Sequence, residues 1–171
     1  MEEQVILVDE KDRQTGFAGK FEAHRKGHLH RAVSVFIFNS QGELLLQKRA
    51  KGKYHSSGLW SNTVCGHPLP GENTMDAANR RLQQEMGMKV ALSTIGSFTY
   101  KEKVGNGLVE HELDHVYYGI SDTVPVPDPS EAEDWKYISI EKLKADLLRQ
   151  PELYTCWLKI CVDRKILGEF I

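Results

Sequence analysis

The chain has 171 residues and carries 22 Lys and Arg against 24 Asp and Glu, which gives a net charge of −2 at pH 7. A chain of this length buries an ordinary hydrophobic core, and we expect residues 1–171 to form a single domain. The near balance of charge excludes an overall basic bias toward nucleic acid or an anionic membrane, so a bound anion must be held by a local group of cations.

The N-terminal residues, the lack of a long apolar run and the cysteines indicate the cellular compartment. The first residues, MEEQVILVDE, are acidic where a secretory signal is basic, and nowhere do about eighteen apolar residues run together. We therefore expect a cytoplasmic protein that does not enter a membrane. Cys65, Cys156 and Cys161 lack CxxC spacing and would stay reduced in the cytosol, as thiols available for packing or for chemistry.

Strands are predicted for most of the first two thirds of the chain. Residues 4–9 (QVILVD) and 32–38 (AVSVFIF) are rich in β-branched and aromatic residues, and NSQGE then turns the chain into LLLQ as a hairpin. The stretches SNTVCGH, SFTYKEKV and LVEHELDHVYYGI also favour strands, followed by KYISI.

Three helices are predicted. Residues 74–86 (TMDAANRRLQQEM) place Met75, Ala78 and Leu82 along one stripe and stop at Gly87. A second helix over 141–150 follows Ser139 as its cap, and a third over 151–167 opens with a proline suited to the first helical position. The elements together predict an α+β fold.

Six of the seven histidines lie in three short segments: HRKGHLH at 24–30, CGH at 65–67 and VEHELDH at 109–115. In a strand, residues two apart share a face, so Glu110 and Glu112 point the same way and His111 the opposite way. Two adjacent carboxylates repel unless a cation lies between them, and the other histidines would complete the shell of Mg, Mn or Zn. The alternative for the glutamate pair alone is a solvated strand face.

The letters HELDH at 111–115 also fit the H-E-x-x-H pattern of zinc proteases. That pattern requires a helix, which presents its two histidines to one ion. Here the stretch lies between Gly107 and Gly119 and continues into VYYGI, which is typical of a strand. We therefore favour the strand over the protease.

Basic residues flank the histidine-bearing segments, and RAKGK at 49–53 reads as a flexible cationic loop. Arginine gives forked contacts and lysine a point charge, a combination that suits a diphosphate. The alternatives are a solvated charged surface and, for Arg81 with Glu85 four residues on, a simple pair on a helix. The basic residues are Lys20, Arg49, Lys53, Arg80 and Arg81.

The stretch GHPLPGENTMDAANRRLQQEMGM at 66–88 resembles the Nudix box, a loop–helix–loop element. Arg81 and Gln84 depart from it, because a Nudix hydrolase has glutamates there that hold catalytic magnesium. This degeneracy weighs against diphosphate hydrolysis. The positions that match are Gly66, Glu72, Arg80, Leu82, Glu85 and Gly87.

The degenerate box, with NTVCGHP before it and VEHE after it, looks like the type 1 isopentenyl-diphosphate isomerases, a Nudix-fold branch. The resemblance implies a mixed β-sheet sandwiched by helices. It also implies a small-molecule prenyl diphosphate substrate and the interconversion of isopentenyl and dimethylallyl diphosphate in isoprenoid biosynthesis. In that reaction a proton adds to the terminal CH2, a tertiary carbocation forms, and another proton leaves the neighbouring carbon.

The resemblance also implies two metal sites and a diphosphate site. One Mg²⁺, Mn²⁺ or Zn²⁺ ion would be bound in a near-octahedral shell by His24, His30, His67, Glu110 and Glu112. A second ion, Mg²⁺, would bridge Glu85 and the substrate diphosphate. The cations implied around the phosphates are Lys20, Arg49, Lys53 and Arg81.

The resemblance assigns the acid and the base to Cys65 and Glu112, with a hydrogen bond from Tyr100 to Glu112. Trp157 would face the carbocation through cation–π attraction. Taken alone, Cys65 fits an inert buried thiol, and Trp157 fits a core residue of an amphipathic helix. Two other functions stay open, a Nudix hydrolase of a nucleoside-diphosphate derivative and a non-catalytic module that binds a diphosphate.

Overall fold

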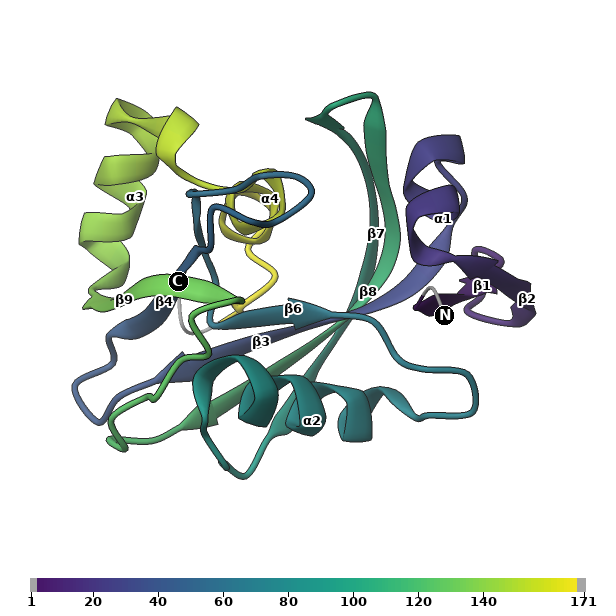
Figure 1. The fold of residues 1–171 in the computed structure, drawn as a ribbon. Coiled ribbons are helices and arrows are strands. Elements are labelled where there is room, and N and C mark those ends of the chain that lie inside the picture. The colour runs from purple at the N-terminus through teal and green to yellow at the C-terminus, as the bar shows by residue number, and fades with distance from the viewer. Residues whose placement is uncertain (1–2, 169–171) are drawn as a thin grey trace.

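The computed structural model describes residues 3–168, and a mixed sheet of nine strands runs through this part of the chain (Figure 1). β3 is central, because it pairs antiparallel with β4 and β6 and parallel with β8. The strands are β1 (Gln4–Val8), β2 (Gln14–Gly19), β3 (His30–Phe38), β4 (Leu44–Arg49), β5 (Trp60–Ser61), β6 (Val64–Gly66), β7 (Ser93–Gly105), β8 (Leu108–Ile120) and β9 (Ala132–Ile138).

Helices cover both faces of the sheet. In Figure 1, α2 lies below it, while α3 and α4 lie above it. Within residues 3–168 no helix reaches the length and apolarity needed to cross a membrane. The helical elements are α1 (Lys20–Lys26), α2 (Thr74–Met86), α3 (Ile140–Arg149), a 3-10 turn η1 (Pro151–Leu153) and α4 (Cys156–Asp163).

The alternation of side chains along β3 divides the core in two. Val33 and Val35 face α2 and pack with its Leu82, whereas Phe36 and Phe38 face α3 and α4. Successive residues of a strand point to opposite faces, so one apolar run supplies both cores. The predicted mixed sheet sandwiched by helices is therefore confirmed.

The helix predicted over 74–86 is confirmed with the same bounds. The Asn73 side chain accepts the backbone N–H of Asp76 at 2.8 Å and so caps the first turn. At the other end Gly87 has φ +64°, and its N–H donates to the carbonyl of Gln83. A Cβ at Gly87 would also come within 2.6 Å of the Val126 carbonyl oxygen, so the helix ends where only glycine fits.

The continuous helix predicted over 151–167 is wrong. The chain forms the short turn η1, leaves the helical conformation at Tyr154 and begins α4 only at Cys156. The Thr155 N–H donates to the Trp60 carbonyl at 2.9 Å, and Tyr154 bridges to Trp60 as in a sheet. These contacts satisfy the backbone outside a helix, and the interruption redirects α4 toward β5.

Other differences are smaller. SNTVCGH forms two short strands, β5 and β6, in place of one, and β2 and α1 were not predicted from the sequence. The prediction of α3 is confirmed to within a residue at each end, with the Ser139 hydroxyl accepting the Lys142 N–H at 3.3 Å. The hairpin of β3 and β4 is also confirmed.

Candidate active site

Strand register brings the ligand-type residues together. Glu112 on β8 lies opposite His30 on the parallel strand β3 and opposite Tyr100 on the antiparallel strand β7. Cys65 on β6 lies opposite Ser34, on the other side of β3. Glu110 and Glu112 are 3% and 8% exposed, so both carboxylates are buried.

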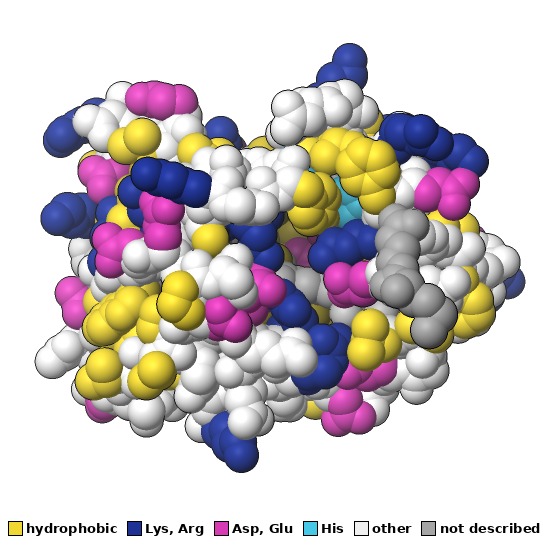
Figure 2. All heavy atoms as spheres, in the orientation of Figure 1, with side chains coloured by type: hydrophobic (Ala, Val, Ile, Leu, Met, Phe, Trp, Pro, Cys, Tyr) yellow, Lys and Arg dark blue, Asp and Glu magenta, His cyan; other side chains and the backbone are white. Residues whose placement is uncertain are grey.

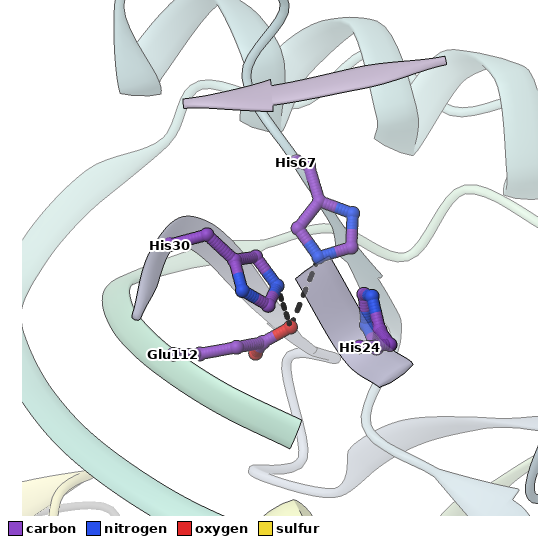
Figure 3. Close-up of side chains that lie close together, drawn as sticks. All are labelled: His24, His30, His67 and Glu112. Carbon is purple, nitrogen blue, oxygen red and sulfur yellow. Dashed lines mark hydrogen bonds and ion pairs between the residues drawn. The ribbon is translucent and has the colours of Figure 1, made fainter. Parts of the chain in front are cut away.

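A buried cluster forms from His24, His30, His67 and Glu112, whose ligand atoms all lie within 4.8 Å of one another. The Nε2 atoms of His67 and His30 lie 3.0 and 3.5 Å from Glu112 Oε1. Figure 3 shows both rings turned toward this carboxylate, with His24 beside them. Glu110 adjoins the cluster, because its Oε2 lies 3.4 Å from His24 Nε2.

The chemistry of these donors fits a cation. His24 Nδ1 lies 2.7 Å from the Lys20 carbonyl and His30 Nδ1 lies 2.9 Å from the His28 carbonyl. Carbonyls only accept, so each Nδ1 carries the proton and each Nε2 presents a lone pair to a carboxylate. His30 Nε2 and Glu110 Oε2 are buried without hydrogen-bond partners. Facing acceptors of this kind are satisfied by a positive ion between them.

The ionisation states agree with a metal site. Burial raises the pKa of Glu112, but its contacts with His30 and His67, among them the hydrogen bond with His67, outweigh burial and hold the pKa well below its usual value. Burial lowers the pKa of His67 well below its usual value, against the effect of Glu112. An ionised carboxylate and a neutral imidazole are the forms that bind metals.

A second demand for positive charge arises at His24. Burial lowers the pKa of this residue, but the nearby Glu110 carboxylate outweighs burial, so the pKa is raised. His24 Nε2 and Glu110 Oε2 therefore favour a positive charge between them, which a proton or a metal ion would supply.

Tyr100 holds the second oxygen of Glu112. Its hydroxyl donates to Glu112 Oε2 at 2.7 Å. Burial and the charge of Glu112 raise the pKa of Tyr100 well above its usual value, so the phenol keeps its proton and remains a donor.

Asn62 orients both Cys65 and Trp157, and sequence reasoning missed it. Its amide donates to the carbonyls of Val35 and Val64 at 3.1 and 2.9 Å, which leaves Oδ1 free to accept. That oxygen accepts the Cys65 thiol at 3.0 Å and the Trp157 indole N–H at 3.2 Å. Burial raises the pKa of the Cys65 thiol, so the sulfur carries a proton.

The predicted phosphate-binding cations line the same pocket. Figure 2 shows a hollow with Lys and Arg side chains gathered around it and a histidine visible inside. The guanidinium of Arg49 lies 5.2 Å from the centre of the Trp157 ring, so one wall joins a cation to the aromatic face. The pocket's predicted residues are Lys20, Arg49, Lys53, Cys65, His67, Arg81, Tyr100, Glu110, Glu112 and Trp157.

Carboxylates hold these cations in place. Arg81 donates twice to Glu85 Oε1, at 2.6 and 3.0 Å, and lies 3.3 Å from Glu131. Lys53 also pairs with Glu131, a residue that sequence reasoning missed. Glu85 is buried beneath Arg81, and its other oxygen accepts the Gln47 amide at 2.8 Å.

The protease interpretation of HELDH is wrong, because residues 111–115 lie in β8. Strand residues four apart are separated by about 13 Å, too far to share one ion. His111 Nδ1 contacts the Gly27 carbonyl and His115 contacts Asp12. Neither residue joins the buried cluster.

His55, the one histidine outside the three segments, belongs to the pocket. It is 4% exposed, and its Nε2 lies 2.7 Å from Glu110 Oε1. Its ligand atom also lies within 4.8 Å of those of His24 and Glu110. No local pattern in KYHSSG indicated this position, because the partner comes from a distant strand.

The fold and the pocket define a class of protein. A family model described as the NUDIX domain matches residues 28–158. A crystal structure of DR0079 from Deinococcus radiodurans is similar in fold, with a TM-score of 0.78 and 22% identity over 95% of this chain and 98% of that one. The class is a Nudix fold with a buried His/Glu cluster that could hold a metal.

Closer relatives narrow the family. Isopentenyl-diphosphate Delta-isomerase 2 of Aromatoleum aromaticum is 55% identical over 97% of this chain and 88% of that protein. Isopentenyl-diphosphate Delta-isomerase of Pectobacterium atrosepticum is 51% identical over 94% and 90%. The chain belongs to the Nudix family and, within it, to the isopentenyl-diphosphate Delta-isomerases.

Proposed function

We propose that this protein isomerises isopentenyl diphosphate to dimethylallyl diphosphate, a step of isoprenoid biosynthesis. The observation that carries the proposal is one pocket that presents a protonated thiol at Cys65 and an ionised carboxylate at Glu112 beside a set of cations. A proton donor and a proton acceptor are what an allylic shift of a double bond requires.

The acid and the base act on the hydrocarbon end of the substrate. A proton adds to the terminal CH2, the positive charge develops on the tertiary carbon, and a different proton leaves the neighbouring CH2. We assign these two transfers to Cys65 and Glu112. Asn62 orients the thiol and Tyr100 holds the carboxylate, so both groups are fixed before the substrate enters.

The carbocation needs an aromatic face and protection from water. Trp157 lines the pocket at 3% exposure, with its indole N–H donating to Ser61 Oγ at 2.9 Å. This bond fixes the ring, which would stabilise the carbocation through cation–π attraction. The buried walls keep water from capturing the cation.

The opposite end of the substrate is held by charge. We propose that Lys20, Arg49, Lys53 and Arg81 bind the diphosphate. As part of the same proposal, Glu85 would hold a Mg²⁺ ion, which would supply positive charge to the diphosphate. These contacts anchor the substrate and leave its double bond to the pocket interior.

The residues present fit a metal at the buried cluster. His24, His30, His67, Glu110 and Glu112 would hold Mg²⁺, Mn²⁺ or Zn²⁺, since imidazole and carboxylate suit all three. When bound, the ion supplies positive charge that balances the buried carboxylates. Glu112 is then held in one orientation by its neighbours.

The test is proton NMR of the protein with isopentenyl diphosphate and Mg²⁺ in D2O. We expect dimethylallyl methyl signals and deuterium in the product, lost in Cys65→Ala and in Glu112→Gln. Cys161→Ala is the matched control, because that thiol belongs to α4 and lies in the core on the side of the sheet that faces α3 and α4. Full activity in Cys65→Ala would show that the assigned pair is wrong.

Two further measurements separate the other two functions from the isomerase. Release of phosphate from nucleoside-diphosphate derivatives would indicate a Nudix hydrolase. Binding of isopentenyl diphosphate without exchange of its protons would indicate a non-catalytic module. Neither is favoured, since Arg81 and Gln84 occupy the places of the hydrolase glutamates and a mere binder has no use for an acid and a base.

A further inference from the structure

His55 lies in the loop between β4 and β5, where it makes contacts with three parts of the pocket. Its Nε2 lies 2.7 Å from Glu110 Oε1, and its Nδ1 lies 3.1 Å from the Ser56 hydroxyl. The ring also meets Trp157 edge to face, with centroids 5.9 Å apart. These contacts bury the imidazole almost completely.

The partners of His55 fix its tautomer. An ionised carboxylate carries no proton, so Nε2 carries the proton in its 2.7 Å ion pair with Glu110, while the Ser56 hydroxyl can donate to Nδ1. Both ring nitrogens are then engaged, and His55 has no lone pair left for a metal. It differs in this respect from His24 and His30, whose Nε2 atoms point into the cluster.

The ion pair with His55 selects an orientation for Glu110. Oε1 is paired with His55, whereas Oε2 is buried without a hydrogen-bond partner and lies 3.4 Å from His24 Nε2. Without the ion pair with His55, the carboxylate is free to rotate about its terminal torsion, which is broad for glutamate. Oε2, the Glu110 oxygen that does not pair with His55, is therefore the one that faces the cluster.

The backbone of the loop is shaped to place this ring. Ser56 has φ +50° and Gly58 has φ +72°, and a positive φ at a residue other than glycine is strained. Arg49 ties the loop closed, because its side chain donates to the His55 carbonyl at 3.2 Å and its carbonyl accepts the Gly58 N–H at 2.9 Å. Because these contacts hold the turn in a strained conformation, we infer that the position of the His55 ring matters for function.

We propose that His55 is a positioning residue that orients Glu110 toward a divalent ion and couples the loop of Arg49 and Lys53 to the metal centre. The inference rests on the proposed role of Glu110 as a ligand. Residues behind metal ligands set ligand orientation, and their loss typically weakens metal binding by about 10- to 100-fold.

The test compares two isosteric variants. His55→Gln places an amide N–H near the position of Nε2, whereas His55→Asn keeps a polar atom near Nδ1 and loses the donor to Glu110. Affinity for Mn²⁺ is measured by electron paramagnetic resonance without substrate. We expect His55→Asn to bind about 10- to 100-fold more weakly than wild type, and His55→Gln to recover most of the loss.

The matched control is Ser57→Ala, an exposed position in the same loop. Melting temperatures of all variants establish that each is folded. Equal affinity in wild type and His55→Asn would overturn the proposal, and so would equal losses in the Gln and Asn variants, which would make His55 itself a ligand. Because no turnover is needed, an inactive wild type that binds Mn²⁺ would overturn only the isomerase proposal.

Discussion

Gly66 lies directly under Arg81, and replacing it with alanine should displace that arginine without unfolding the protein. A Cβ at residue 66 would stand 2.8 Å from Arg81 Cγ and 3.1 Å from its Cδ and Nε. Carbon atoms in favourable contact are about 3.5–4.0 Å apart, so one side must yield. The arginine side chain yields more easily than β6, which is paired with β3.

The displacement has a calculable cost. Moving Arg81 breaks its two bonds to Glu85 Oε1 at 2.6 and 3.0 Å and carries the guanidinium away from the proposed diphosphate site. The loss of one hydrogen bond from Arg81 to the charged diphosphate costs about 1.5–3 kcal/mol. Since 1.4 kcal/mol is a factor of ten, we expect Gly66→Ala to lower kcat/KM by about 10- to 150-fold.

Steady-state isomerisation kinetics and thermal unfolding test this reasoning together. Gly16→Ala is the control, because a Cβ there meets nothing within 4 Å. In an Arg81→Ala background, Gly66→Ala should have little further effect on kcat/KM, since both changes act through one side chain. An unchanged kcat/KM in Gly66→Ala, or losses that multiply in the double variant, would refute the argument.

Three further predictions concern the carboxylate, the metal and the core. Tyr100→Phe removes the 2.7 Å donor to Glu112, and we expect kcat to fall about 10-fold or more with KM unchanged, whereas an unchanged kcat would contradict the role. Removal of metal by a chelator should lower the melting temperature. Mn²⁺ at about 100 times its Kd should then raise the free energy of unfolding by about 2.7 kcal/mol, measured by calorimetry. Identical melting with and without the metal would argue against a metal site. Leu143→Ala, buried in α3, should cost about 2–5 kcal/mol in urea unfolding without changing KM, and a loss below about 1 kcal/mol would argue against tight packing there.

Local patterns predicted most of the fold. Strand alternation in 108–120 indicated that Glu110 and Glu112 share a face, and Gly87 marked the end of α2. The failure at 151–167 has a non-local cause, because the bond from Thr155 to Trp60 joins segments that no window of sequence contains. Propensity favoured a continuous helix, and a tertiary contact overrode it.

The candidate site was predictable to the extent that its residues carried a family motif. The roles of Cys65, Glu112 and Trp157 came from a resemblance and remain predictions, although the pocket brings all three together. His55 and Asn62 lie in irregular segments with no periodicity, and their distant partners, Glu110 and Trp157, become visible only in the folded chain.

The parallel pairing of β3 with β8 sets the order of events during folding. Its register joins residues such as His30 and Glu112, 82 positions apart along the chain. Contacts of such long range carry a large loop-closure cost and form late. His30 and Glu112 meet only through this pairing, so the proposed ion finds its complete set of ligands after the sheet has closed. We therefore expect metal uptake to report the completion of folding, and we expect a partly folded chain not to retain the ion at this site.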